Sequence, residues 1–170
     1  PKQFCSDLKM SIYLYIVRHG EAEPMTEHDE LRQLTEHGCW EAKRTALWLH
    51  TQVAKFDRVY ASPYVRAQQT KDIVLNKVPE SSNVETLKEL TPEGDARVCM
   101  DYLLANIDDI EQVNESEINI LCVSHMPLVS YLIGEFTGYT PIMATAGVAK
   151  IRIDLERWNG LLETLLAPEQ

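Results

Sequence analysis

Two stretches of the chain are predominantly apolar, and each ends abruptly in polar residues that include a histidine. The first covers residues 12–17 and is followed by Arg18 and His19; the second covers residues 118–123, with one polar residue, Asn119, and leads through one serine to His125. Near-continuous apolar runs rich in β-branched residues predict central strands that are covered on both faces, as in a parallel sheet. Because functional groups gather at the carboxyl ends of such strands, the two histidines are expected at one edge of the sheet.

Helical periodicity appears between the predicted strands. After Thr35, a suitable N-cap, apolar side chains recur at spacings of three and four, which predicts a helix with one face in the core. Ser62 and Pro63 suit the N-cap and the first position of a second helix, so that Arg66 falls in its first turn. The other helical markers are Cys39, Ala42, Ala46, Leu49 and Val53 for the first helix, Val98, Tyr102 and Leu103 for a third, and residues 128–136 for a buried fourth.

Four shorter segments complete the predicted sheet. Residues 56–61 and 83–87 are read as two further strands, and residues 88–95, which contain a proline and a glycine, as a loop. Residues 147–154 and 160–166 flank a Trp-Asn-Gly turn and are typical of antiparallel strands with one solvated face. The predicted fold class is therefore α/β: a single-domain, three-layer α/β/α sandwich whose mostly parallel central sheet has an antiparallel edge.

Composition limits the classes of partner. A chain of 170 residues with 45% hydrophobic content fits one domain, and its net charge of −10 makes nucleic acid an unfavourable partner. No apolar run approaches the roughly 20 residues that span a bilayer, and no secretory signal precedes the first strand, so no membrane contact and a cytoplasmic location are expected. Residues 1–9, which precede Met10, are interpreted as an N-terminal extension or a cloning remnant, and residues 10–168 as the domain.

The cysteines and two of the histidines are interpreted as structural. The cysteines are scattered and form no C-x-x-C pair, which argues against a zinc site or a disulfide framework, and we expect them to be reduced and mostly buried. His37 and His50 have no chemically suitable neighbours in the sequence and are expected at the surface or at helix ends. The four cysteines are Cys5, Cys39, Cys99 and Cys122.

The polar strand ends carry residues suited to phosphate chemistry. His19 is preceded by an arginine and followed by Gly20, so its imidazole could be a nucleophile beside a cation that binds phosphate; the alternative is a polar strand end without a function. Arg66, near the start of a helix, could share an anion with the partial positive charge of the helix N-terminus, and the alternative there is an ordinary surface arginine.

Together these segments resemble the histidine phosphatase superfamily, which includes the cofactor-dependent phosphoglycerate mutases. Residues 18–21 (Arg-His-Gly-Glu) resemble its nucleophile motif, residues 62–70 its second arginine motif and residues 124–125 its second histidine motif, all in the order of that family. The resemblance covers residues 10–166. Its most similar form is the compact SixA type of phosphohistidine phosphatase, on the strength of Glu-Leu-Thr-Pro at 89–92 and the sequence that follows the second histidine.

The resemblance implies a phosphoglycerate mutase-like fold and a covalent mechanism. His19 would attack phosphorus and become a transient phosphohistidine, with its other nitrogen held by a backbone carbonyl near the glycine. Arg18, Arg66 and His125 would bind the phosphoryl oxygens, and no metal or cofactor is implied. Phosphoryl transfer depends mainly on positioning and on neutralising charge, which suits these groups. Bound phosphate is expected to favour the protonated form of His125.

The general acid is open at the level of sequence. Glu89, after the third predicted parallel strand, is the best positional candidate, and its alternative reading is a solvated loop carboxylate. Glu21 and Glu23 are the other candidates. A phosphohistidine substrate eases the requirement, because its nitrogen leaving group obtains a proton more readily than an ester oxygen does.

The expected substrate is a phosphohistidine-containing protein, such as a histidine phosphotransfer domain or a phosphotransferase-system carrier. A chain of this length leaves little room for segments that close over a small substrate, and an open pocket suits a phosphoryl group carried on a protein. Inorganic phosphate or an analogous anion should also occupy the pocket. One alternative is a phosphatase for small phosphate esters, and another is an inactive module that binds phosphoproteins.

Overall fold

The computed structural model describes residues 10–80, 84–110 and 116–168, which form one six-stranded sheet in the order β3-β2-β4-β1-β5-β6. The residues predicted as an extension, 1–9, lie outside the described part. The parallel strands are β1 (Ser11–Arg18), β2 (Arg58–Ala61), β3 (Val84–Thr86) and β4 (Glu117–Ser124), and the antiparallel edge consists of β5 (Val148–Asp154) and β6 (Asn159–Leu166). The predicted mostly parallel sheet with an antiparallel hairpin is confirmed.

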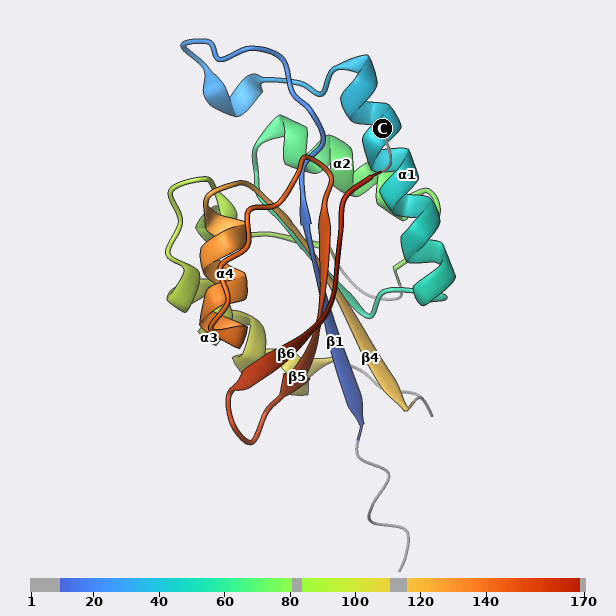
Figure 1. Ribbon diagram of the computed structural model, residues 1–170, viewed down its shortest axis with the longest axis vertical. Coiled ribbons are helices and arrows are strands. Elements are labelled where there is room, and N and C mark those ends of the chain that lie inside the picture. The colour runs from blue at the N-terminus through green and yellow to red at the C-terminus, as the bar shows by residue number, and fades with distance from the viewer. Residues whose placement is uncertain (1–9, 81–83, 111–115, 169–170) are drawn as a thin grey trace, which may run out of the picture.

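Helices cover both faces of this sheet, as the prediction of a three-layer sandwich requires. One face carries α1 (Glu36–Gln52) and α2 (Val65–Leu75), and the opposite face carries α3 (Ala96–Ala105) and α4 (Leu128–Thr137) (Figure 1). Strand β1 lies at the centre between β4 and β5, so its carboxyl end is surrounded by the loops of neighbouring strands.

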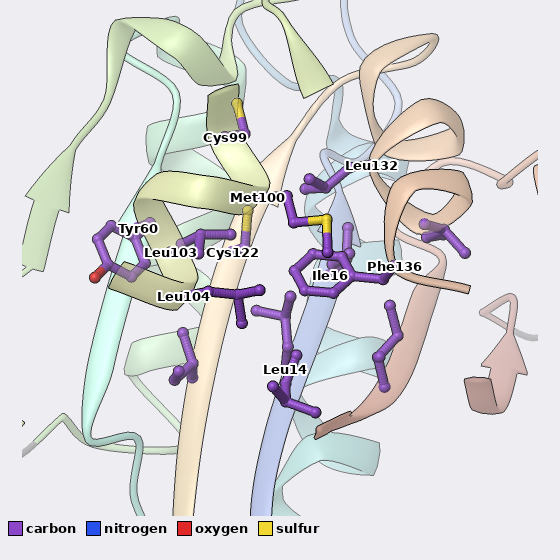
Figure 2. Packing of buried hydrophobic residues seen from close by; sticks show 14 of the residues in the cluster. Leu14, Ile16, Tyr60, Cys99, Met100, Leu103, Leu104, Cys122, Leu132 and Phe136 are labelled. Atoms are coloured by element: carbon purple, nitrogen blue, oxygen red, sulfur yellow. The ribbon is translucent and has the colours of Figure 1, made fainter. Parts of the chain in front are cut away.

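The central strands are largely apolar because each supplies side chains to two separate cores; the buried Asn119 of β4 is an exception. In β1, Leu14 and Ile16 join the cluster under α3 and α4, whereas Tyr15 and Val17 join the cluster under α1 and α2. Successive residues of a strand point to opposite faces, so a strand covered on both sides has no place for an alternating polar residue. Figure 2 shows the first cluster, in which Met100 and Phe136 from the two helices pack toward Leu14 and Ile16.

The start of α2 differs from the prediction. The helix begins at Val65 with Tyr64 as its N-cap, so Ser62 is not the N-cap and Pro63 is not its first residue. Ser62 instead continues β2, because its N–H donates to the Val123 carbonyl at 3.0 Å and extends the pairing of β2 with β4. Arg66 still lies in the first turn, as predicted.

The predicted cap of α1 is correct, because the Thr35 side chain accepts a hydrogen bond from the N–H of Gly38. The predicted stripe of α3 was partly wrong: Val98 is 50% exposed and Tyr102 is 36% exposed. Asp95 caps this helix. The face that the helix turns toward the core is formed by Cys99, Met100, Leu103 and Leu104.

Two smaller predictions concern the loop after β3 and the thiols. Residues 88–95 contain a short 3₁₀ helix, Lys88–Leu90, in addition to turns, because the buried Leu90 anchors the segment to the core. Cys99 and Cys122 are buried free thiols and Cys39 is a half-buried one, whereas Cys5 lies outside the described residues.

Candidate active site

The ends of β1 and β4 bring the two motif histidines together. The strands are parallel and in register, with Arg18 paired to Ser124, and the N–H of His19 donates to the Ser124 carbonyl at 3.0 Å. His125 follows directly, and the two imidazole ring centres lie 5.0 Å apart. The edge of the sheet at which they meet lies beneath the loop that follows β1, at the top of Figure 1.

His19 is held with a defined nitrogen facing its cationic neighbours. Its Nδ1 lies 2.7 Å from the carbonyl oxygen of Gly20, and a carbonyl can only accept, so Nδ1 carries the proton. The lone pair is therefore on Nε2, which accepts from Nε–H of Arg66 at 3.3 Å. His19 is only 7% exposed. The backbone carbonyl that the family resemblance implied is present at the expected place.

Gly20 is required for close approach rather than for flexibility. A Cβ at this position would lie 2.4 Å from the carbonyl oxygen of Gly38 in α1. Because that oxygen belongs to the backbone, it could not move aside as the end of a flexible side chain could. The Gly20 N–H also donates to Thr70 Oγ1 at 3.1 Å, and the Thr70 hydroxyl donates to the Arg66 carbonyl at 2.9 Å. Helix α2 is thus linked through Thr70 to the backbone N–H of Gly20, the residue whose carbonyl orients His19.

Arg66 is oriented by Asp29, a residue that no sequence pattern singles out. The Arg66 guanidinium donates to the Asp29 backbone carbonyl at 2.7 Å and to Asp29 Oδ2 at 3.1 Å. The other oxygen of this carboxylate accepts from Arg32 Nε at 2.7 Å. Asp29 therefore connects two guanidiniums, and Arg32 is a third arginine at the site. Spacing alone could not have found this bridge, because it joins the β1 loop to the start of α2.

Arg18 and the loop before β5 form one wall of the site. The Arg18 guanidinium donates to the Met143 carbonyl at 2.8 Å, whereas its buried Nε has no hydrogen-bond partner within the described ranges. The buried Glu41 of α1 joins this wall to the β1 loop: one carboxylate oxygen accepts from the Glu21 N–H at 2.8 Å and the other from the Thr145 hydroxyl at 2.7 Å. Glu41 was also not selected from the sequence.

His125 has its own hydrogen-bond partner and one unpaired atom. The residue is 1% exposed, and its Nε2 lies 2.7 Å from Ser62 Oγ. Its Nδ1 is buried and, like Nε of Arg18, has no partner in the part of the chain that the structure describes. An unpaired buried polar atom costs free energy unless a ligand satisfies it, which suits a site that accepts an anion.

A pocket of about 330 Å³ opens beside these groups; His19, Arg18 and Arg66 line it, whereas the buried His125 is not among its lining residues. It contains three arginine side chains, the nucleophile candidate His19 and two carboxylates. Glu89 does not line it; that residue lines a neighbouring hollow between the β3 loop and α3. Glu21 does line the pocket, but Glu23 does not. The full lining is Arg18, His19, Glu21, Ala22, Met25, Asp29, Arg32, Arg66, Pro92, Met126 and Thr145.

Burial and positive charge keep both histidines neutral. Desolvation, with smaller contributions from Arg66 and Arg18, lowers the pKa of His19 to about 4, although its hydrogen bond to Gly20 acts in the opposite direction. Desolvation and the neighbouring His19 and Arg66 lower the pKa of His125 to about 2. Both lowered pKa values refer to the protein without a ligand. The sequence-based expectation, that His125 becomes protonated, refers to the protein with phosphate bound.

Asp29 stays ionised despite its position. Desolvation alone would raise its pKa, but the hydrogen bonds from Arg32 and Arg66 outweigh that effect and lower it. An ionised carboxylate that is paired with two guanidiniums is a poor proton donor. Asp29 is therefore suited to orienting the arginines and not to acting as a general acid.

The described residues contain neither a candidate metal site nor a helix that could span a membrane. No group of three or more His, Cys, Asp or Glu side chains there is arranged to hold a metal ion. Among the same residues, none of the helices has the length and apolar character needed to cross a membrane.

Comparisons with known proteins agree with this geometry. The family model of the histidine phosphatase superfamily (branch 1) matches residues 14–92. The phosphohistidine phosphatase SixA of Escherichia coli is 38% identical over 157 residues, covering 91% of this chain and 93% of that protein. A SixA homolog of Haemophilus influenzae is 35% identical over 132 residues, covering 74% of this chain and 77% of the relative.

A solved structure extends the comparison to three dimensions. The structure of the protein histidine phosphatase SixA complexed with tungstate superimposes with a TM-score of 0.82 at 34% identity, over 92% of this chain and 97% of that one. Its compact α/β sandwich is thus shared, and the predicted phosphoglycerate mutase-like fold is confirmed. On the sequence, the fold and the order of its motifs, this chain belongs to the histidine phosphatase superfamily.

Proposed function

We propose that this protein is a phosphohistidine phosphatase that works through a covalent phosphoryl intermediate on His19. The observation that carries the proposal is the orientation of His19: its proton is committed to the Gly20 carbonyl, and its Nε2 lone pair lies beside the Arg66 guanidinium. The kinship with SixA phosphatases and the tungstate bound by one of them support both the reaction and an anion in this pocket.

The first step transfers the phosphoryl group between two nitrogens. Nε2 of His19 donates its electron pair to phosphorus while the P–N bond of the substrate breaks and its electron pair returns to the substrate imidazole. That imidazole leaves as a neutral molecule when its other nitrogen already carries a proton. His19 then bears the phosphoryl group on Nε2 and a proton on Nδ1, and the Gly20 carbonyl stabilises the resulting positive ring at 2.7 Å.

Water completes the cycle by attacking phosphorus on the opposite side from Nε2. The N–P bond breaks, inorganic phosphate leaves, and His19 returns to its starting tautomer with its electron pair on Nε2. Arg18, Arg66 and His125 are assigned to the phosphoryl oxygens in both steps. Two of them carry buried nitrogen atoms that have no hydrogen-bond partner among the described residues, Arg18 Nε and His125 Nδ1. Fixed donors of this kind stabilise the charge that spreads over the oxygens in the transition state.

The pocket favours a P–N bond over an alkyl ester. An alcohol leaving group needs a proton donor, and the carboxylates at hand are poorly suited: Asp29 is ionised by its arginines, and Glu21 accepts a hydrogen bond from the Thr35 hydroxyl at 2.8 Å. Glu89 lines a separate hollow, which argues against its proposed role as the acid. A leaving imidazole that arrives protonated does not need any of them.

The proposed substrate is a protein that carries phosphohistidine, such as a histidine phosphotransfer domain or a phosphotransferase-system carrier, and the proposed functional unit is residues 10–168. A location in the cytoplasm remains a prediction from the sequence. The specific alternative is a phosphatase for small phosphate esters. A module that only binds phosphoproteins is less consistent with a nucleophile whose tautomer is set for attack.

The test is a comparison of substrates for the same preparation of enzyme. Phosphate release is measured from a phosphorylated histidine phosphotransfer domain, from a phosphorylated phosphotransferase carrier and from a panel of alkyl and aryl phosphate esters. We expect higher kcat/KM for a phosphohistidine protein than for any alkyl ester. A preference for alkyl esters would support the small-molecule alternative, and binding without turnover of any substrate would support the binding module.

A further inference from the structure

The Ser62 hydroxyl is placed to decide which nitrogen of His125 carries the proton. Ser62 Oγ accepts from the Tyr64 N–H at 3.2 Å and lies 2.7 Å from Nε2 of His125. Within the described residues these are its two contacts. Ser62 is completely buried, and its backbone is fixed by the 3.0 Å bond to the Val123 carbonyl, so the hydroxyl has little freedom to turn elsewhere.

The proton of the hydroxyl can be assigned by elimination. A serine hydroxyl has one proton and two lone pairs, and the Tyr64 N–H already occupies one lone pair. If Ser62 donates to Nε2, both partners are satisfied and the His125 proton must lie on Nδ1. If Nε2 carried the proton instead, the Ser62 proton would have no acceptor among the described residues, whereas Nδ1 has no partner there in either tautomer. Tautomers are set by such networks.

We propose that Ser62 is a positioning residue that holds His125 in the Nδ1–H tautomer, so that a neutral histidine donates a hydrogen bond to the phosphoryl group. This inference rests on the proposed function for the identity of the ligand, but not for the state of the ring. His125 then acts as a donor without becoming an imidazolium, which fits a ring buried among His19 and three arginines.

The proposal explains how two adjacent histidines can have different roles, one attacking phosphorus and the other donating a hydrogen bond. An anion whose oxygens accept from Nδ1–H of His125 gains a hydrogen bond that the free site lacks, because this atom is buried and unpaired there. A neutral donor also avoids placing a further positive charge 5.0 Å from the ring that must attack phosphorus. The ring of Tyr64, 5.1 Å from that of His125, packs against it edge-on and limits its rotation.

The decisive experiment reads the tautomer directly. Long-range ¹H–¹⁵N correlation spectra of the full-length protein at neutral pH, assigned with His125→Gln, should show His125 protonated on Nδ1 and unprotonated on Nε2. In Ser62→Ala the ring should shift toward Nε2–H, and Ser62→Thr, which keeps a hydroxyl, should restore the wild-type pattern. Ser130→Ala removes a different buried serine hydroxyl and should change nothing.

Tungstate binding supplies the second measurement. The Kd for tungstate should rise about tenfold in Ser62→Ala, the scale of one neutral hydrogen bond, and should be near the wild-type value in Ser62→Thr and Ser130→Ala. Wild-type His125 found as Nε2–H or as an imidazolium at neutral pH overturns the proposal, and so does Ser62→Ala with unchanged tautomer and affinity. Because the wild-type spectrum suffices, failure of a variant to fold does not remove the test.

The two proposals can fail separately. If the spectra and the tungstate affinities are as expected but no phosphohistidine protein is hydrolysed, the assigned role of Ser62 stands and the proposed substrate is wrong. If phosphohistidine proteins are hydrolysed but His125 has the other tautomer, the function stands and the role of Ser62 is wrong.

Discussion

The ends of β1 and β4 carry the same residue in the same setting, yet the nitrogens of the two rings have different partners. Both histidines are buried at the ends of neighbouring parallel strands, and burial lowers the pKa of each. They differ in their partners: a carbonyl on Nδ1 of His19 and a hydroxyl on Nε2 of His125. The carbonyl leaves His19 with its lone pair on Nε2, beside Arg66, whereas the hydroxyl, as proposed here, leaves His125 with an N–H on Nδ1. In the proposed mechanism, the partner of each buried histidine therefore determines whether that ring attacks or donates.

Among the variants, His19→Ala should lose the most activity. The substitution removes the proposed nucleophile, so hydrolysis of a phosphohistidine protein should be abolished and no phosphoenzyme should form. Phosphate release and acid-labile labelling of the protein measure the two effects. His50→Ala, on the exposed face of α1, is the control and should be fully active. Substantial activity in His19→Ala would contradict the covalent mechanism.

Removal of one guanidinium should have the next largest effect. Arg18→Ala and Arg66→Ala should each lose about 2.7–4 kcal/mol of transition-state stabilisation, or roughly 10²- to 10³-fold in kcat, by analogy with the loss of one donor to an oxyanion. Steady-state kinetics check this, with the exposed Arg152→Ala of β5 as the control. Near-normal rates for either pocket variant would mean that the phosphoryl site is elsewhere.

The variant His125→Ala distinguishes the proposed role of His125 from that of His19 in the kinetics of phosphoenzyme formation. The variant loses a donor but keeps the nucleophile, so we expect turnover to fall by at least about 10²-fold while phosphorylation of His19 still occurs slowly. Rapid-quench measurement of the phosphoenzyme distinguishes this outcome from that of His19→Ala. If the two alanine variants behave identically, with no phosphoenzyme in either, the assignment of attack to one ring and donation to the other is not supported.

In their effect on stability the two histidines should behave alike. Their folded-state pKa values, about 4 and about 2, lie below the roughly 6.5 of an unfolded histidine. The unfolded state therefore binds more protons below pH 6.5, and the stabilisation that is complete above this pH is lost as the pH falls. Each ring should account for about 2 kcal/mol of the loss between pH 7.5 and 5.

Urea unfolding at the two pH values measures this loss. His19→Gln and His125→Gln should each make the free energy of unfolding less sensitive to pH than in the wild type, and His50→Gln should not. Equal pH dependence in all four proteins would mean that the buried rings do not resist protonation.

The smallest effect is expected from Glu89→Gln. Because Glu89 lines a separate hollow, hydrolysis of a phosphohistidine protein should change little. General acid catalysis contributes about 10²- to 10⁴-fold where a leaving group needs a proton, so a series of alkyl and aryl esters on both proteins shows whether Glu89 ever supplies one. The exposed Glu80→Gln is the control. A selective loss with alkyl esters would return Glu89 to the acid role.

Much of the fold followed from local patterns. The two apolar runs determined the central strands, because a strand covered on both faces is apolar at nearly every position, and β1 supplies both cores in this way. The cap at Thr35 was also a local matter. The stripe of α3 was predicted less well, because Val98 and Tyr102 are apolar residues that the neighbouring elements leave exposed.

Short-range patterns along the chain account for the chemistry at the sheet edge: two histidines and two arginines, each placed by a strand end or a helix start. What these groups can do depends on contacts that form only in the folded chain. Ser62 contacts His125 across 63 positions of the chain, and Asp29 contacts Arg66 across 37. Because protonation and orientation depend on such contacts, and not on local propensity, Glu89 could be selected from its position in the sequence and still lie outside the pocket.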